Sequence, residues 1–324
     1  MIVTARSVSR VAVSRVAYLG PPGTFTEQAL LTQPDLAAAE HLLCRSIPEV
    51  LASTSDGLVD WGFTAIENSI EGTVNITLDT LIFELDLLIQ REVVMDIQLH
   101  LLAHPGTSLE QVKRVISFPV ATAQCRRYLG KHLSEVEEVV AGSTAAAVRD
   151  LAASGDTSAA AIGTALAREL YGLDTIASDI EDHPENQTRF VAVSRRGVPT
   201  PTGYDKTSVV VFQRSDRSGS LMRILAEFES RSINLTKLES RPTKKALGDY
   251  CFLIDLEGHV ADPRVADCLR SIREEHGEVK FLGSYPAAAT PGSSAGSPPT
   301  YMDDAELSRI IHTIGQFRAD PQQE

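Results

Sequence analysis

The 324-residue sequence has only four cysteines, and none of them are paired in a metal-binding spacing. Disulfide-rich secreted domains and zinc modules both depend on closely spaced cysteines. No CxxC motif occurs, and the four thiols stand far apart among apolar neighbours. We therefore expect no metal site and a cytoplasmic protein with buried, reduced thiols at Cys44, Cys125, Cys251 and Cys268.

Long apolar runs and basic blocks are also missing. No stretch approaches the roughly 20 apolar residues of a membrane-spanning helix, and residues 1–15 lack the apolar core of a signal peptide. Lys and Arg total 30 against 43 Asp and Glu, which gives a formal net charge of −13. An acidic chain without a basic cluster is a poor match for nucleic acid or an anionic membrane surface. We expect neither partner, and we interpret residues 1–15 as a disordered lead-in.

Repeated β-turn-α units occupy residues 16–198. Short apolar runs, such as residues 61–66 and 159–162, each lead through a polar turn into a helical pattern. This alternation predicts an α/β fold whose ligand crevice lies at the carboxyl ends of parallel strands. Extended segments near residues 90–96 and 182–184 predict two lobes joined by two strands, with a small-ligand cleft between them. Lobe 1 is expected at about 16–92 and 183–198, and lobe 2 at about 93–182.

A different pattern follows a linker rich in Pro, Gly and Thr at residues 195–204. Residues 205–286 alternate as βαββαβ, which is typical of a ferredoxin-like α+β unit. Residues 287–324 form a low-complexity tail that begins with a stretch rich in Ala, Pro, Ser and Gly. Within that tail, residues 303–317 have the spacing of a short amphipathic helix.

Hydroxyl and amide side chains gather at the turns of the βα units. Thr24 follows a strand and a Pro-Pro-Gly turn, with Glu27 three residues later in a capping-box pattern. Side chains of this kind can donate hydrogen bonds to an anion, but ordinary helix capping is an alternative at several positions. The polar side chains singled out at these turns are Thr24, Asn68, Ser69, Thr73, Ser143 and Thr144.

The stretch from Asn186 to Phe190 stands between an acidic, proline-marked turn and a short apolar run. The run is rich in β-branched and aromatic residues and predicts a strand. An amide, a hydroxyl and a guanidinium, from Asn186, Thr188 and Arg189, therefore arrive together at the mouth of that strand. Such groups can hold a small oxyanion, but they also begin ordinary strands, so this stretch alone leaves the function open.

Five separated motifs distinguish the first part of the chain. They are Tyr18–Leu30 (YLGPPGTFTEQAL), Glu67–Val74 (ENSIEGTV), Ser117 with Gln124 and Cys125, Ser143–Thr144, and Asn186–Phe190 (NQTRF). Together and in this order they resemble prephenate dehydratase. Two further motifs, Asn234–Pro242 (NLTKLESRP) and Gly248–Phe252 (GDYCF), resemble the ACT regulatory domain of the same family. The resemblance covers roughly Val16 to Tyr285.

The resemblance implies a two-lobed catalytic domain like that of type II periplasmic binding proteins, followed by the ferredoxin-like ACT domain. It also implies a lyase that converts prephenate to phenylpyruvate, water and CO2 in L-phenylalanine biosynthesis, with no metal or redox cofactor. Thr188 would give or relay the proton to the departing hydroxyl. Arg189 would either neutralise a substrate carboxylate or pair with an acid of the protein. The other residues implied as catalytic are Glu67, Asn68, Ser117 and Gln124, and those implied in substrate binding are Thr24, Ser69, Thr73, Ser143, Thr144, Asn186, Arg189 and Phe190.

By the same resemblance, L-phenylalanine binds between paired ACT domains and inhibits the enzyme, which implies a homodimer or homotetramer. The family's Gly-Ala-Leu-Val motif is altered here to Gly219-Ser220-Leu221-Met222, which leaves the strength and selectivity of inhibition open. The implied effector residues are Gly219, Ser220, Leu221, Asn234, Glu239, Ser240, Arg241 and Pro242.

Two alternatives stay open at this point. Arogenate dehydratase would act on a substrate with an amino group in place of the keto group, and the sequence offers no clear acid for an ammonium. A non-catalytic amino-acid sensor would share the fold, although the intact Thr188 argues against it. About fifteen residues precede Val16, too few for the chorismate mutase domain of bifunctional relatives, so we expect no mutase activity.

Overall fold

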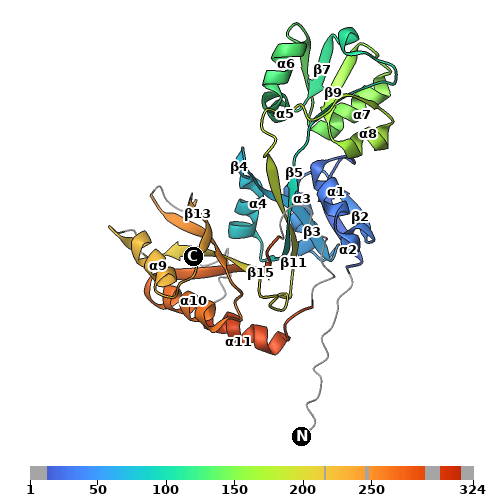
Figure 1. Ribbon diagram of the computed structural model, residues 1–324. Coiled ribbons are helices and arrows are strands. Elements are labelled where there is room, and N and C mark those ends of the chain that lie inside the picture. The colour runs from blue at the N-terminus through green and yellow to red at the C-terminus, as the bar shows by residue number, and fades with distance from the viewer. Residues whose placement is uncertain (1–12, 215–216, 245–247, 289–299, 315–324) are drawn as a thin grey trace.

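The computed structural model describes residues 13–214, 217–244, 248–288 and 300–314, and Figure 1 shows two lobes and a small C-terminal domain. Two mixed sheets form the lobes and an antiparallel sheet forms the small domain. The predicted fold class, α/β lobes followed by a ferredoxin-like unit, is therefore confirmed. The predicted disordered lead-in lies almost wholly outside the described residues, although Arg15 already begins the first strand.

Lobe 1 contains the strands β1 (Arg15–Leu19), β2 (Glu40–Cys44), β3 (Trp61–Asn68), β4 (Gly72–Thr73), β5 (Leu88–Asp96) and β11 (Gln187–Ser194). They form one sheet in the order β2-β1-β3-β11-β5, with β4 paired to β3. The first three strands are parallel, whereas β11 runs antiparallel to both β3 and β5. The strand that returns from lobe 2 therefore lies inside the sheet of lobe 1.

The helices of lobe 1 are α1 (Phe25–Leu31), α2 (Pro34–Ala37), α3 (Ile47–Ser55) and α4 (Asn75–Asp79), which continues into a π-helical turn, η1 (Thr80–Glu84). Local sequence explains where α3 begins. Ser46 caps it by accepting a hydrogen bond from the backbone N–H of Glu49, and a proline occupies its first turn. The buried Val50 and Leu51 then hold α3 on the sheet.

Lobe 2 contains the strands β6 (His100–Ala103), β7 (Arg114–Ser117), β8 (Glu137–Val140), β9 (Ala159–Gly163) and β10 (Asp174–Ala177), in the order β10-β6-β9-β7-β8. Its helices are η2 (Leu109–Gln111, a 3-10 turn), α5 (Pro119–Gln124), α6 (Arg126–His132), α7 (Thr144–Ser154) and α8 (Ala165–Tyr171). Every residue of β9 is buried, which its small side chains permit. Two extended segments join the lobes, β5 on the way out and β11 on the way back (Figure 1).

The small domain contains β12 (Asp205–Gln213), α9 (Ser220–Glu229), β13 (Leu235–Pro242), β14 (Tyr250–Glu257), α10 (Pro263–Glu275) and β15 (Gly277–Pro286). The sheet order is β13-β14-β12-β15, so β13 and β15 are its edges. Both helices pack on one face, where Ile224, Phe228 and Leu269 meet Val209 and Ile254. This leaves the opposite face of the sheet for another contact.

That opposite face packs on lobe 1, and the two share one apolar core. Leu78 and Val191 of lobe 1 belong to the same cluster as Val210 and Leu253 of the small domain. At Gly283, an added Cβ would stand 2.5 Å from the carbonyl oxygen of Ile89, and the φ of +139° also favours glycine. Glycine thus permits β15 to approach the backbone of β5.

The C-terminal segment returns to the small domain as α11 (Asp304–Ile314). Its Leu307 and Ile314 are buried in the core that also holds α10. Just before α11, Tyr301 forms an isolated antiparallel bridge with Pro199. Residues 315–317 of the predicted helix and most of the predicted low-complexity segment lie outside the described residues. Within the described ranges, none of the helices is long and apolar enough to cross a membrane.

Candidate active site

The centre of the site is a cross-strand pair, Asn68 at the end of β3 and Thr188 near the start of β11. The register places them opposite each other, and Asn68 Nδ2 donates a hydrogen bond to Thr188 Oγ1 over 2.8 Å. Asn68 Oδ1 accepts from the backbone N–H groups of Ile70 and Glu71, each over 2.9 Å. Because the carbonyl oxygen is used there, the NH2 group faces Thr188. The Thr188 oxygen accepts this bond and keeps its own proton for another acceptor.

Three further predicted residues extend this pair into a hydrogen-bonded cluster. Asn68 Nδ2 also donates to Asn186 Oδ1 over 2.8 Å, and Asn186 Nδ2 donates to Gln124 Oε1 over 3.1 Å. Ser69 Oγ accepts from the backbone N–H of Gln187 over 2.9 Å. The structure thus brings together five of the predicted residues, which we call the amide cluster: Asn68, Ser69, Gln124, Asn186 and Thr188.

The amide cluster lies where lobe 1 meets lobe 2. Gln124 comes from α5 of lobe 2, and the other members come from β3, β11 and the residues next to them. Gln124 Nε2 also donates to Glu71 Oε1 over 3.2 Å. Glu71 was not selected from the sequence, although it stands inside one of the motifs. Asn186 is 1% and Thr188 8% exposed, and neutral donors in such a shielded site can stabilise charge that develops on a bound molecule.

Thr24, Ser143 and Thr144 lie at helix starts, as the capping alternative predicted. Thr24 Oγ1 accepts from the backbone N–H of Glu27 over 3.2 Å. Ser143 caps α7 in the same way, and Thr144 is the first residue of that helix. The capping box at α1 is incomplete, because the Glu27 carboxylate accepts from the backbone N–H of Gly23 over 2.5 Å. These three side chains contribute no hydrogen bond to the amide cluster among the described residues.

A second contact between the lobes involves the turn that precedes α1. Thr164 Oγ1 of lobe 2 donates to the carbonyl oxygen of Gly23 over 2.8 Å, and the Tyr171 hydroxyl donates to that of Pro22 over 3.0 Å. A Cβ at Gly23 would stand 2.9 Å from Ala167, so glycine permits this approach. The Pro-Pro-Gly turn of the first motif therefore serves as a contact with lobe 2.

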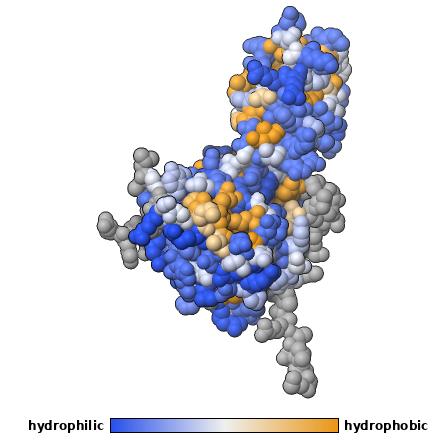
Figure 2. Space-filling model, turned by 60° about the vertical axis from the view of Figure 1, so that its left-hand side comes forward, coloured by the Kyte–Doolittle hydropathy of each residue, from blue (hydrophilic) through white to orange (hydrophobic). Residues whose placement is uncertain are grey.

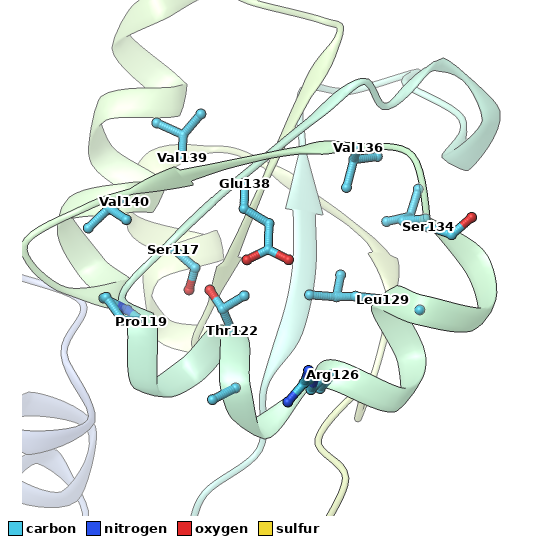
Figure 3. Close-up of a pocket in the computed structure, with 13 residues that line it drawn as sticks. Ser117, Pro119, Thr122, Arg126, Leu129, Ser134, Val136, Glu138, Val139 and Val140 are labelled. Atoms are coloured by element: carbon cyan, nitrogen blue, oxygen red, sulfur yellow. The ribbon is translucent and has the colours of Figure 1, made fainter.

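Ser117 lines a different cavity, within lobe 2. This cavity of about 460 Å³ lies between β8 and the helices α5 and α6, and no member of the amide cluster lines it. Figure 3 shows Ser117, Thr122 and Glu138 pointing into it. Ser117 is 1% exposed, and its Oγ has no hydrogen-bond partner in the described part of the chain. The structure therefore does not join Ser117 to Thr188.

Arg189 faces away from the amide cluster and bonds to acids of the protein, which favours the second of its two predicted roles over substrate binding. Successive side chains of a strand point to opposite faces, so the neighbour of Thr188 points toward the small domain. Arg189 donates to Glu92 over 2.7 Å, to Asp255 over 2.6 Å and to Tyr285 over 2.7 Å. Burial lowers the pKa of Arg189, but these neighbours outweigh it and raise the pKa well above its usual value. Arg189 is an interdomain residue.

Glu67 and Thr73 also point toward the small domain, which corrects their predicted places in the catalytic and substrate sites. The Glu67 carboxylate pairs with Lys237 Nζ over 2.8 Å. Thr73 Oγ1 donates to Glu239 Oε2 over 2.5 Å and accepts from Lys237 over 3.1 Å. Glu67 and Thr73 are paired across β3 and β4, and both side chains bond to β13 rather than to the amide cluster.

Phe190 belongs to the core of lobe 1, which corrects its prediction as a substrate contact. It is 1% exposed and stacks on Phe63, with ring centroids 5.8 Å apart and an interplanar angle of 9°. The β3–β11 register shifts between Arg189 and Phe190. Phe190 therefore anchors β11 onto β3 immediately behind the catalytic candidate.

The predicted effector residues divide between two surfaces of the small domain. Arg241 donates to Asn75 of lobe 1 over 3.0 Å and to Glu239 over 2.6 Å. Within one chain Glu239 and Arg241 are therefore interdomain residues, and their predicted part in an effector site between paired domains stays a prediction. Asn234, Ser240 and Pro242 are exposed, while Gly219 begins α9 with a φ of +81° and is followed by the partly exposed Ser220 and Leu221.

One group on the small domain has the composition of a metal site. Glu227, Glu275 and His276 bring their ligand atoms within 4.8 Å of one another. The Glu227 carboxylate is already occupied, because it pairs with Arg231 over 2.7 Å and contacts His276 over 3.2 Å. These ion pairs explain why the three side chains lie close together.

The chain matches known proteins over most of its length. Residues 16–198 match the family model for prephenate dehydratase. A prephenate dehydratase of Mycolicibacterium vanbaalenii is 41% identical over 304 residues, which cover 90% of this chain and 95% of the relative. The crystal structure of an Arthrobacter aurescens prephenate dehydratase in complex with L-Phe is 40% identical, with a TM-score of 0.80, over 92% of this chain and 97% of that one.

A second similar structure carries a different description. It is described as a novel type of quorum quenching acylase, is 29% identical and has a TM-score of 0.75, over 85% of this chain and 98% of that one. The family model and the curated relative agree on the chemistry of lobes 1 and 2. The chain belongs to the prephenate dehydratase family and is a lyase of phenylalanine biosynthesis that converts prephenate to phenylpyruvate.

Proposed function

We propose that the amide cluster binds prephenate and that Thr188 donates the proton to the departing hydroxyl group. The hydrogen bond from Asn68 to Thr188 is the observation that carries this proposal. Because the Thr188 oxygen accepts from Asn68, its own O–H is available to a substrate oxygen. The two backbone N–H groups on Asn68 Oδ1 hold the amide in this orientation.

The proposed reaction step transfers one proton and breaks two bonds of the ring carbons, one to the carboxylate and one to the hydroxyl oxygen. The ring carboxylate leaves as CO2, its electrons enter the ring, and the bond from the ring to the hydroxyl oxygen breaks. The departing hydroxide takes the Thr188 proton and leaves as water, and Thr188 regains a proton from solvent when the product departs. The Asn68 N–H group stabilises the charge that develops on Thr188 Oγ1. Aromatisation of the ring drives the step.

Neutral donors hold the substrate carboxylates in this proposal. Ser69, Gln124 and Asn186 present hydroxyl and amide groups beside Thr188. When the lobes close on the substrate, polar groups at strand ends and helix starts of both lobes add further donors. The residues assigned this role are Thr24, Ser117, Ser143 and Thr144, the last two at the positive end of the α7 dipole.

Dehydration suits this cluster better than amide hydrolysis, the type of reaction that the acylase among the similar structures implies. A hydrolytic threonine needs a neighbouring base to take its proton. Here the side-chain partner of Thr188 Oγ1 is the Asn68 amide, which donates a hydrogen bond and cannot accept a proton at its nitrogen. A threonine that is held as an acceptor is arranged to give its proton to a leaving group.

L-phenylalanine inhibition through the small domain, in a homodimer or homotetramer, is the second part of the proposal. The similar Arthrobacter structure is a complex with L-Phe. Strand β13 is a sheet edge, and an edge strand can pair with that of a second copy. Leu238 on β13 and Tyr250, which pairs with Pro242 of β13, are exposed, as is Met222 on α9, and Figure 2 shows apolar side chains gathered on the face turned forward. The effector would lie between copies, beside Gly219–Leu221 and Ser240.

The cysteines support a cytoplasmic location. All four are buried and unpaired. Burial raises the pKa of Cys251 to about 11 and that of Cys268 to about 12, so these thiols are protonated at neutral pH. Protonated, unpaired thiols suit a reducing compartment.

The experiment is an assay of phenylpyruvate formation from prephenate with wild type, Thr188→Val and Thr188→Ser, with and without L-Phe. Valine removes the hydroxyl and keeps the β-branched shape, and we expect a loss in kcat of at least about 100-fold. Serine keeps the hydroxyl and should retain most of the rate. Near-normal turnover by Thr188→Val would reject the role of Thr188. A flat response to millimolar L-Phe would reject the proposed inhibition.

A further inference from the structure

The strands that carry Asn68 and Thr188 carry a second cross-strand pair directly beside them. The register pairs Thr188 with Asn68 and Arg189 with Glu67. The two pairs point to opposite faces of the sheet. The pair of Asn68 and Thr188 faces the junction with lobe 2, and the pair of Glu67 and Arg189 faces the small domain. The two pairs are joined by the peptide bonds of β3 and β11.

The small domain holds the second pair from three of its strands. Arg189 bonds to Asp255 on β14 and to Tyr285 on β15, and it approaches Glu67 within 3.5 Å. Glu67 in turn pairs with Lys237 on β13 over 2.8 Å. The Arg189 side chain is 11% exposed and that of Lys237 12% exposed, so these contacts are shielded and geometrically constrained.

Lys237 connects this pair to the rest of β13. Its Nζ donates to Thr73 Oγ1 over 3.1 Å and lies 3.6 Å from Glu239 Oε2. Glu239 accepts from Thr73 and from Arg241. Lys237, Glu239 and Arg241 alternate along one face of β13, and together with Glu67, Thr73 and Arg189 they form what we call the interface network.

We propose that Glu67 and Arg189 are positioning residues for Asn68 and Thr188, and that Lys237 is the residue through which the small domain sets them. This inference rests on the proposed roles of Thr188 and of L-Phe. A displacement of Lys237 moves Glu67, and the shared backbone carries the movement to Asn68 and Thr188. A misplacement of about 1 Å in a catalytic group can cost on the order of 100-fold in rate. A small shift of β13 is therefore sufficient to slow the reaction.

Three variants of the full chain test this inference. Lys237→Met removes the ammonium and Lys237→Arg keeps a cation. Lys280→Gln is the control for domain docking, because Lys280 Nζ also crosses the interface, to the carbonyl oxygens of Ile82 and Leu85 at 3.1 Å each, outside the interface network. Each variant is assayed for kcat, for KM and for the L-Phe concentration that halves the rate.

We expect Lys237→Met to lower kcat about fivefold to tenfold while KM stays within about twofold. The L-Phe concentration that halves its rate should rise at least about tenfold, because one step of the network is missing. Lys237→Arg and Lys280→Gln should stay within about twofold of wild type in all three quantities.

The inference would be overturned if Lys237→Met kept the kcat and the L-Phe response of the wild type. It would also be overturned if Lys280→Gln lost as much kcat as Lys237→Met. If Lys237→Met unfolds, Glu67→Gln weakens the same contact from lobe 1, and an unchanged kcat in that variant would likewise overturn the inference. If the wild type ignores L-Phe, the proposed inhibition fails, and the comparison of kcat values still decides the positioning role.

Discussion

Lobe 1 has two junctions, and they are built differently. Its junction with lobe 2 is built around hydrogen bonds between neutral groups, such as those from Asn186 to Gln124 and from Thr164 to Gly23, with one further bond from Gln124 to the Glu71 carboxylate. Its junction with the small domain combines a shared apolar core with buried ion pairs around Arg189. The first resembles a hinge that can open for a substrate, whereas the second resembles the interior of a single domain.

This difference suits the lobe 2 junction to substrate binding and the small-domain junction to holding the fold together. Neutral groups at the inter-lobe junction can exchange a protein partner for a substrate carboxylate at little cost. Buried charges at the other junction cannot, because an unpaired buried charge costs several kcal/mol. The proposed catalytic pair and the proposed supporting pair thus stand on adjacent residues but face different kinds of surroundings.

The largest effect on stability is expected for Arg189→Met. The variant leaves the Glu92 and Asp255 carboxylates buried without their guanidinium, and we expect the free energy of unfolding to fall by about 3–5 kcal/mol. Denaturant unfolding measures this change. Arg15→Met, which breaks an exposed pair with Glu40, should cost less than about 1 kcal/mol. Similar losses of unfolding free energy in the two variants would show that the buried ion pairs of Arg189 contribute no more than an exposed pair.

Gly283→Ala should break the close approach between the small domain and lobe 1. The new Cβ would meet the Ile89 carbonyl oxygen at 2.5 Å, and we expect a loss of about 2–3 kcal/mol. Gly106→Ala is the matched control, because Gly106 also has a positive φ, +81°, but its Cβ would have no neighbour within 4 Å. The control should cost about 1 kcal/mol. Equal thermal shifts in both variants would mean that strain at φ alone explains the loss.

Gln124→Ala tests the junction between lobes 1 and 2. It removes hydrogen bonds to Asn186 and Glu71 that cross between the lobes. We expect kcat/KM to fall about tenfold, since one proposed substrate donor is lost, while the free energy of unfolding changes by less than about 1 kcal/mol. A large loss of stability with normal kinetics would instead make Gln124 a structural residue.

The smallest expected effect is the pH dependence that Glu239, at the junction with the small domain, gives to the stability of the fold. Burial raises the pKa of Glu239, but its bonds to Thr73 and Arg241 and the charge of Lys237 outweigh burial and lower it below 4.5. A carboxylate with a lowered pKa stabilises the fold above its unfolded pKa and loses that contribution as pH falls through the folded value. The Tm of wild type should therefore exceed that of Glu239→Gln by the largest amount near pH 7, and this excess should shrink below about pH 4.5. A difference that grows in acid would contradict this sign.

Much of the architecture could be predicted from the sequence, because strand, turn and helix signals are local. The polar turn after residues 61–66 pointed to Asn68 and the strand entry at Asn186–Phe190 to Thr188, and the structure pairs them. The motif Asn186–Phe190 leaves Arg189 open between a substrate carboxylate and an acid of the protein, and the structure pairs it with Asp255 of the small domain. Strand alternation already favours this outcome, since adjacent residues of a strand point to opposite faces of the sheet.

The docking of the small domain could not be predicted in the same way. Glu67, Glu239 and Arg241 look like site residues in sequence because they are polar and stand in motifs. Their partners come from segments more than 150 residues away, as in the bond from Arg241 to Asn75. Which face of the β13 sheet is covered depends on how two folded units meet, and no local signal contains that information.

The central claim is that neighbouring pairs on β3 and β11 have separate roles, and kcat and the free energy of unfolding measured together for Thr188→Val and Arg189→Met test it most directly. Thr188→Val should lose at least about 100-fold in kcat with less than about 1 kcal/mol lost in stability. Arg189→Met should lose about 3–5 kcal/mol in stability. A Thr188→Val enzyme with near-normal kcat, or an Arg189→Met enzyme as stable as wild type, would contradict the account.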